Sequence, residues 1–159
     1  MELTQNEINE RVAVLKRYRS LLEQQRSKFA EYLKVLELQE NEICEEDENA
    51  LRLHTEIESQ IVENIACLQK VIVPMQSLYE KSHAFFSPQD SMPVSSIQNE
   101  LESLQKKVQA QNSKNQALLK VHMEKLQTQM ANFTNPFRNR RSPYAKAAAT
   151  SGSMFAIEV

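Results

Sequence analysis

The stretch INERVAVLKRYRSLLEQQRSKFAEYLKVLELQENEI, residues 8–43, decides the fold class, because apolar residues recur through it at intervals of seven. Further apolar residues beside that series widen the stripe to the width of a packed helix. Thr4 and Glu7 just before it have the spacing of a capping box. We therefore predict a long helix over residues 4–45. It cannot cover its own stripe, so it must pack on another helix, from this chain or from a second copy. The series is Ile8, Leu15, Leu22, Phe29, Leu36 and Ile43.

The acidic segment ENEICEEDEN, residues 40–49, is the expected position of a bend. Its negative charge favours the start of a following helix, with Asp47 or Glu48 near the N-cap. One continuous helix through this segment is the alternative. A second helical pattern follows over residues 48–85. Pro74 interrupts it and should kink it or end a segment near Val73, although the pattern resumes beyond.

Two prolines in FSPQDSMPV, residues 86–94, predict a loop, and Ser95 with Gln98 has the spacing of a capping box that would begin a third helix over residues 95–134. The apolar seam of this helix fails at polar positions that include Asn112 and Asn115 and then restarts. These asparagines are interpreted as a solvated gap, with a buried device that sets helix register as the alternative. The restarted seam consists of Leu119, Met123, Leu126, Met130 and Phe133.

After Asn135-Pro136 the composition changes, and residues 135–159 are expected to form a disordered C-terminal tail. Residues 101–159 carry 9 Lys/Arg against 3 Asp/Glu, whereas residues 1–50 carry 7 against 12. The basic end therefore complements the acidic start or an acidic partner. The fold predicted is all-α: an elongated antiparallel bundle of about three long helices, as one domain over residues 1–134, followed by the tail.

Several classes of function are disfavoured by the composition. The single glycine, Gly152, leaves no glycine-rich loop for a nucleotide, so a nucleotide-binding enzyme is not expected. The isolated histidines give no metal-ligand spacing, and we expect no catalytic residues, no metal and no cofactor. Arg138, Arg140 and Arg141 are too few to favour nucleic-acid binding. No apolar run approaches the length of a membrane span, no secretory signal is evident, and Cys44 and Cys67 suit free thiols in the cytoplasm.

The methionines point towards protein binding instead. Met123 and Met130 lie on the stripe of the third helix, and the flexible thioether of methionine suits surfaces that accept more than one partner helix. Ordinary core filling is the alternative for each residue taken singly.

Three segments resemble the FlgN family of flagellar export chaperones. They are LLEQQRSKFAEYLKVLELQENEI (residues 21–43), ENALRLHTEIESQIVENIACL (residues 48–68) and NQALLKVHMEKLQTQM (residues 115–130), which is similar to the Asn-x-x-Leu-Leu helix of that family. An isolated tyrosine near the end, Tyr144, also fits the family pattern. The AKAAATSG stretch after Tyr144 departs from the glycine-richer family pattern.

The resemblance implies a cytoplasmic chaperone that binds the C-terminal helical segment of hook-associated proteins, prevents their premature self-association and delivers them to the flagellar type III export gate. By position, Tyr144 would dock on the cytoplasmic domain of the gate. A structural coiled-coil subunit is the alternative, and whether the free protein is a homodimer stays open. The residues that would hold the client are Leu118, Leu119, Met123, Leu126, Met130 and Phe133.

Overall fold

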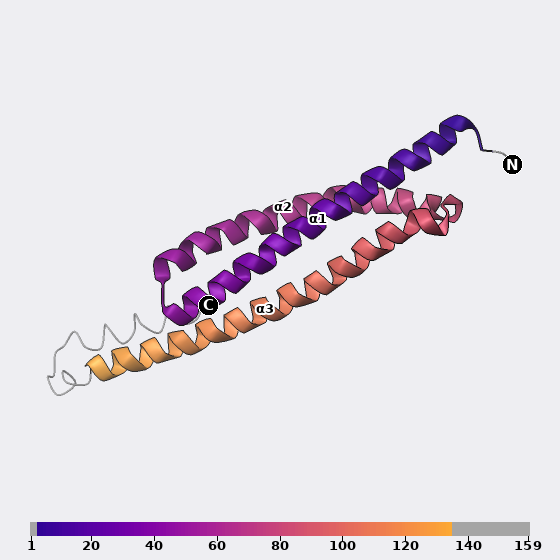
Figure 1. The fold of residues 1–159 in the computed structure, drawn as a ribbon. Helices are drawn as coiled ribbons and strands as arrows, with labels where there is room; N and C mark the ends of the chain where they lie inside the picture. Colours follow the sequence, from indigo (N-terminus) through magenta and orange to yellow (C-terminus); the bar gives the residue numbers. More distant parts are fainter. Residues whose placement is uncertain (1–2, 135–159) are drawn as a thin grey trace. The chain divides into compact units, whose positions relative to one another are not determined.

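The computed structural model describes residues 3–134, and the side chains of residues 3–132. Within that range the chain forms the helices α1 (Gln5–Glu45), α2 (Glu48–Ser82) and α3 (Pro88–Thr134), with a short 3₁₀ turn, η1 (His83–Phe85), between α2 and α3, and no strand (Figure 1). The all-α prediction with three long helices is confirmed. The predicted C-terminal tail, residues 135–159, lies outside the described residues, and so does Tyr144 within it.

Capping interactions set the start of α1 and the turn into α2. The Thr4 hydroxyl accepts from the Glu7 amide, and the Glu7 carboxylate accepts from the Thr4 amide at 2.8 Å, so the predicted capping box is present. These bonds lower the pKa of Glu7, the backbone bond from Thr4 contributing most. The acidic segment contains the predicted bend, because Glu46 takes a left-handed conformation with φ 58° and Asp47 then caps α2 by accepting from the Ala50 amide.

The third helix begins earlier than the predicted residue 95. Ser87 caps it by accepting from the Asp90 amide through its hydroxyl, at 3.3 Å. Pro88 is the first helical residue, where a missing N–H costs nothing. Pro93 lies inside the helix, and Pro74 likewise lies inside an unbroken α2. The loop prediction for residues 86–94 is therefore wrong for most of its length, because both prolines are accommodated within helical backbone.

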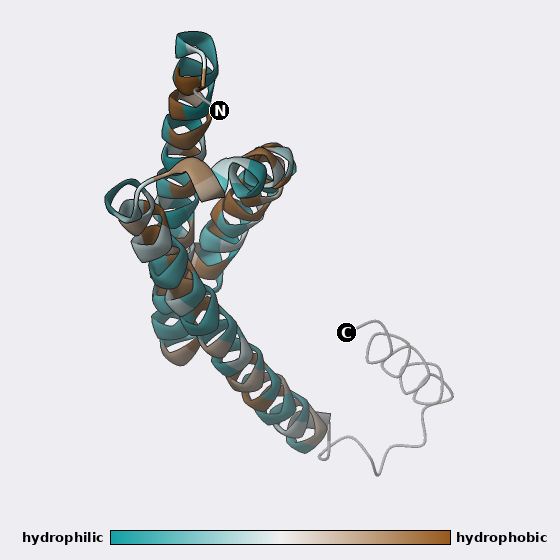
Figure 2. Ribbon diagram, turned by 90° about the vertical axis from the view of Figure 1, so that its right-hand side faces the viewer, coloured by the Kyte–Doolittle hydropathy of each residue, from teal (hydrophilic) through white to brown (hydrophobic). Residues whose placement is uncertain are grey.

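The chain divides into two compact units, residues 1–119 and residues 120–159, with the division inside α3. In the first unit α1 and α2 are antiparallel neighbours (Figure 1): Tyr18 stacks on Tyr79 with ring centroids 4.8 Å apart, while Gln39 near the other end of α1 bonds to Glu58. The first half of α3 completes the core and runs parallel to α1. Each helix is amphipathic, with hydrophobic and hydrophilic residues alternating along it (Figure 2). The core cluster is Tyr18, Leu21, Leu22, Ile72, Tyr79, Val94, Ile97 and Leu101.

Candidate partner-binding surface

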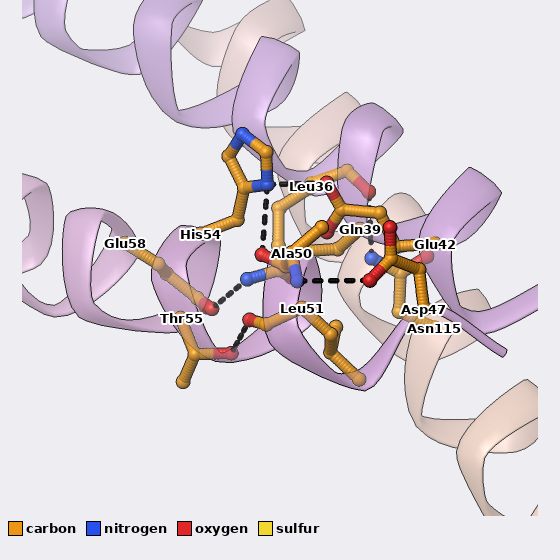
Figure 3. A network of polar contacts seen from close by, with 10 residues as sticks. All are labelled: Leu36, Gln39, Glu42, Asp47, Ala50, Leu51, His54, Thr55, Glu58 and Asn115. Carbon is orange, nitrogen blue, oxygen red and sulfur yellow. Dashed lines mark hydrogen bonds and ion pairs between the residues drawn. The ribbon is translucent and has the colours of Figure 1, made fainter.

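A layer of polar side chains joins α1 to α3, and Figure 3 shows one of its contacts, from Asn115 to Leu36. Asn115 is only 3% exposed, and its amide donates to the Leu36 carbonyl of α1 at 2.8 Å. Beside it, Gln111 donates to Glu40 at 2.5 Å, and Lys114 pairs with the same carboxylate at 2.6 Å. The bonds from Lys114 and then Gln111 hold the pKa of Glu40 below its usual range. Together these contacts fix which turn of α3 lies against which turn of α1.

The interpretation of the polar break in α3 as a solvated gap is wrong for Asn115. The residue is buried, and its side-chain amide is not left unpaired, because it donates to the backbone carbonyl of Leu36 within α1. Asn112 is half-buried. The alternative reading, a buried polar residue that sets register, describes Asn115 correctly.

A second polar set joins α1 to α2. The carboxylate of Glu58 accepts from the Tyr32 hydroxyl at 3.1 Å and from the Gln39 amide at 2.6 Å. Closer to the turn, the buried Glu42 pairs with His54, whose ring nitrogen also contacts the Ala50 carbonyl at 3.0 Å. These contacts are directed and fix which turn of α2 lies beside which turn of α1, although Oε2 of Glu42 is buried without a hydrogen-bond partner.

The seam of α3 changes from buried to exposed along its length. Ile97, Leu101 and Val108 are 4–7% exposed. Leu119 and Leu126, seven residues apart on the seam that restarts after Asn115, are 38% and 58% exposed. In residues 120–132 every described side chain is exposed except the half-buried His122. The seam before Asn115 therefore packs in the core, and the restarted seam after it forms an accessible apolar stripe.

The predicted client-binding residues do not all lie on one face. At about 100° per residue, Leu119, Met123, Leu126 and Met130 fall within one arc of roughly 60°. Met123 and Met130 are 43% and 68% exposed. Leu118 is half-buried and lies about 100° away from Leu119 around the helix axis. The side chain of Phe133 lies outside the described residues.

Other apolar residues of the described helices are accessible as well. Val121 is 60% exposed and lies on the opposite side of α3 from Leu126. On α2, Leu53, Leu78 and Val71 are 57%, 46% and 43% exposed, and Val71 lines an open hollow between α1 and α2. Helical spacing alone places these α2 residues on one side, because Leu53 and Val71 are 18 residues apart, about five turns, and Val71 and Leu78 are seven apart. Only the structure shows which of two apolar faces is covered.

Two kinds of feature are absent from the described part of the chain. Residues 3–134 contain no group of three or more His, Cys, Asp or Glu side chains that could hold a metal ion. Among the same residues no helix is long and apolar enough to cross a membrane. The accessible stripe of α3 can pack against an apolar helix of a partner, because its side chains are spaced one and two turns apart.

Comparison with known proteins gives one informative match. A protein of Treponema pallidum (strain Nichols), which carries the name "Uncharacterized protein", is 33% identical over 131 residues, 82% of this chain and 82% of its own length. No protein-family model matches the chain. No solved structure matches it either. Identity at this level across most of both chains shows that the chain belongs to the same family as this Treponema pallidum protein.

Proposed function

We propose that this protein is a cytoplasmic export chaperone that binds the C-terminal helical segment of flagellar hook-associated proteins, and that it acts by binding rather than by catalysis. The observation that carries the proposal is the accessibility of Met123 and Leu126 on the restarted seam of α3. The FlgN-like segments described above supply the class of client and the export gate as destination.

The stripe suits a helical client for a geometric reason. From Leu119 to Met130 it extends over roughly 16 Å, about three helical turns. An amphipathic client helix would place residues at i, i+3/i+4 and i+7 against it. Methionines at two of the four positions allow the surface to adapt to clients with different side chains.

The same geometry explains how a client could be released. Ordering a disordered segment costs part of the free energy gained from the contacts, so the affinity stays moderate. Release at the gate then requires only a competing interaction, with no chemical step in the chaperone.

The test is calorimetric titration of the protein with the C-terminal segment of a hook-associated protein from the same genome. Leu126→Asp should weaken binding at least about tenfold, since an anchor at the centre of an apolar interface contributes about 2 kcal/mol or more. Val121→Asp is the matched control: Val121 is 60% exposed and Leu126 58%, on the same helix. The control should leave the affinity unchanged.

Each other result has a defined meaning. Equal loss in the two variants would place the effect on helix stability and remove the evidence for this stripe. Absence of binding by the folded wild-type protein would contradict the chaperone proposal and favour a structural coiled-coil subunit, whose permanent partner would then be sought.

A further inference from the structure

A second heptad seam runs along α2, beside its core face, about a quarter turn around the helix from Ile61 and Ile72. Its apolar members recur with the steps of a coiled coil and remain accessible: Leu53 is 57% exposed, Ile57 40%, Val71 43% and Leu78 46%. Gln60 and Asn64 are its polar members near the middle. We call this set the α2 outer seam; its remaining apolar members are Cys67 and Pro74, both exposed.

The residues on one flank of the outer seam already belong to the core. Ile61 is 6% exposed, and Leu68 packs partly buried against the core cluster. Next to them, α1 and α2 enclose an open hollow of about 470 Å³, lined on the α2 side by Asn64, Cys67, Leu68 and Val71. The hollow therefore lies beside the middle of the outer seam, where a side chain from a partner helix can enter it.

We propose that the α2 outer seam is a dimer interface that packs antiparallel against the same seam of a second copy of this chain. Centred between Asn64 and Cys67, such a pair brings Leu53 against the partner's Leu78 and Gln60 against the partner's Val71. By symmetry each contact occurs twice, as a two-fold interface requires. The seam from Leu53 to Leu78 is roughly 38 Å long, enough for eight interlocking positions from each copy.

The charged residues beside the seam favour a second copy of this chain as the partner, and they favour the antiparallel direction. The positions that flank the seam away from the core include Glu56, Glu63 and Lys70, all exposed. In the antiparallel register Glu63 lies opposite the partner's Lys70, and this pair also occurs twice. In a parallel pair the same charges would face the flank occupied by Ile61 and Leu68, so no ion pair would form. Charges at such flanking positions set partner choice and direction in coiled coils.

The experiment is sedimentation velocity of the full-length protein over a range of concentrations. The wild-type protein should show a monomer–dimer equilibrium, and Val71→Asp should raise the dimer dissociation constant at least about tenfold, because each dimer then contains two buried carboxylates. Val62→Asp is the matched control, since Val62 is 44% exposed and Val71 43% on the same helix. Val62 lies on the opposite side of α2 from the seam, so its substitution should leave the constant unchanged.

A charge exchange tests the register with substitutions that do not alter the core. Glu63→Lys and Lys70→Glu should each weaken the dimer, and the double variant should restore it to near the wild-type constant. Circular dichroism establishes that each variant keeps its helix content. A wild-type protein that stays monomeric throughout, or a dimer that resists Val71→Asp and dissociates with Leu126→Asp, would overturn the proposal. Failure of client binding would leave it untouched, because the two surfaces lie on different helices.

Discussion

At the scale of single residues, Tyr32 shows how a polar contact is built into an apolar helix pair. Its hydroxyl donates to the Glu58 carboxylate, which also accepts from Gln39. Burial, followed by the negative charge of Glu58 and then the hydrogen bond to it, raises the pKa of Tyr32 to about 12. All three causes favour the neutral phenol, so the folded state resists its ionisation.

This pKa shift predicts that the contribution of Tyr32 to the free energy of unfolding decreases at alkaline pH. A folded-state pKa above the unfolded value of about 10 means that the contribution of Tyr32 is complete below about pH 10 and is lost as pH rises towards about 12. Tyr32→Phe should cost about 1 kcal/mol near neutral pH, through the lost hydrogen bond. The difference between the two proteins in urea midpoint should then shrink through the alkaline range. A difference that stays constant there would show that the hydroxyl does not titrate in this environment.

At the scale of helices, the sequence predicts well where a local signal coincides with a helix end. The Thr4–Glu7 box and the Asp47 cap are both such signals, and both are present. The predicted start of α3 is wrong because Pro88 and Pro93 favour a loop in the sequence, whereas both lie in helical backbone. Ser87 followed by Pro88, and Ser95 followed by Gln98, both resemble a helix start, and only the packing of Val94, 1% exposed in the core, decides that the segment between them is helical.

In the candidate site, too, the sequence predicts the local features and misses those that depend on distant contacts. The periodicity of α3 identifies the stripe that contains Met123 and Leu126, because helical spacing is a local property. It could not show that Asn115 is buried, because that depends on the Leu36 carbonyl, 79 residues away in the chain. Helical spacing also places Leu118 about 100° away from Leu119, but it could not show that Leu118 is half-buried.

The contact between Asn115 and Leu36 gives a prediction at this scale. Asn115→Ala removes a buried side-chain bond that joins α3 to α1, and it should lower the free energy of unfolding by about 1–2 kcal/mol. Asn112→Ala, at a half-buried position one turn earlier, should cost less than about 0.5 kcal/mol. Urea denaturation followed by circular dichroism measures both. Equal costs would mean that Asn115 does not position α3.

At the scale of the whole molecule, the division after Leu119 separates the core cluster from most of the exposed stripe of α3. Every member of the core cluster lies in the first unit, as does the α2 outer seam. Met123, Leu126 and Met130 belong to the second. Stability and self-association should therefore be properties of residues 1–119, whereas client binding should require the residues that follow.

A chain that ends at Leu119 tests this separation. We expect it to keep the helix content of residues 1–119 and the dimer equilibrium, and to lose at most about 1 kcal/mol of stability, because its new helix end frays near the Asn115 bond. Calorimetry should detect no client binding. Full-length protein with Met123→Asp and Leu126→Asp is the control, since it should lose the client without any new helix end.

Unfolding of the shortened chain would show that the second half of α3 supports the core. Retention of client binding would move the client surface onto α1 or α2, where the outer seam would be the first place to look. Only a shortened chain that is folded, dimeric and unable to bind the client agrees with both proposals together.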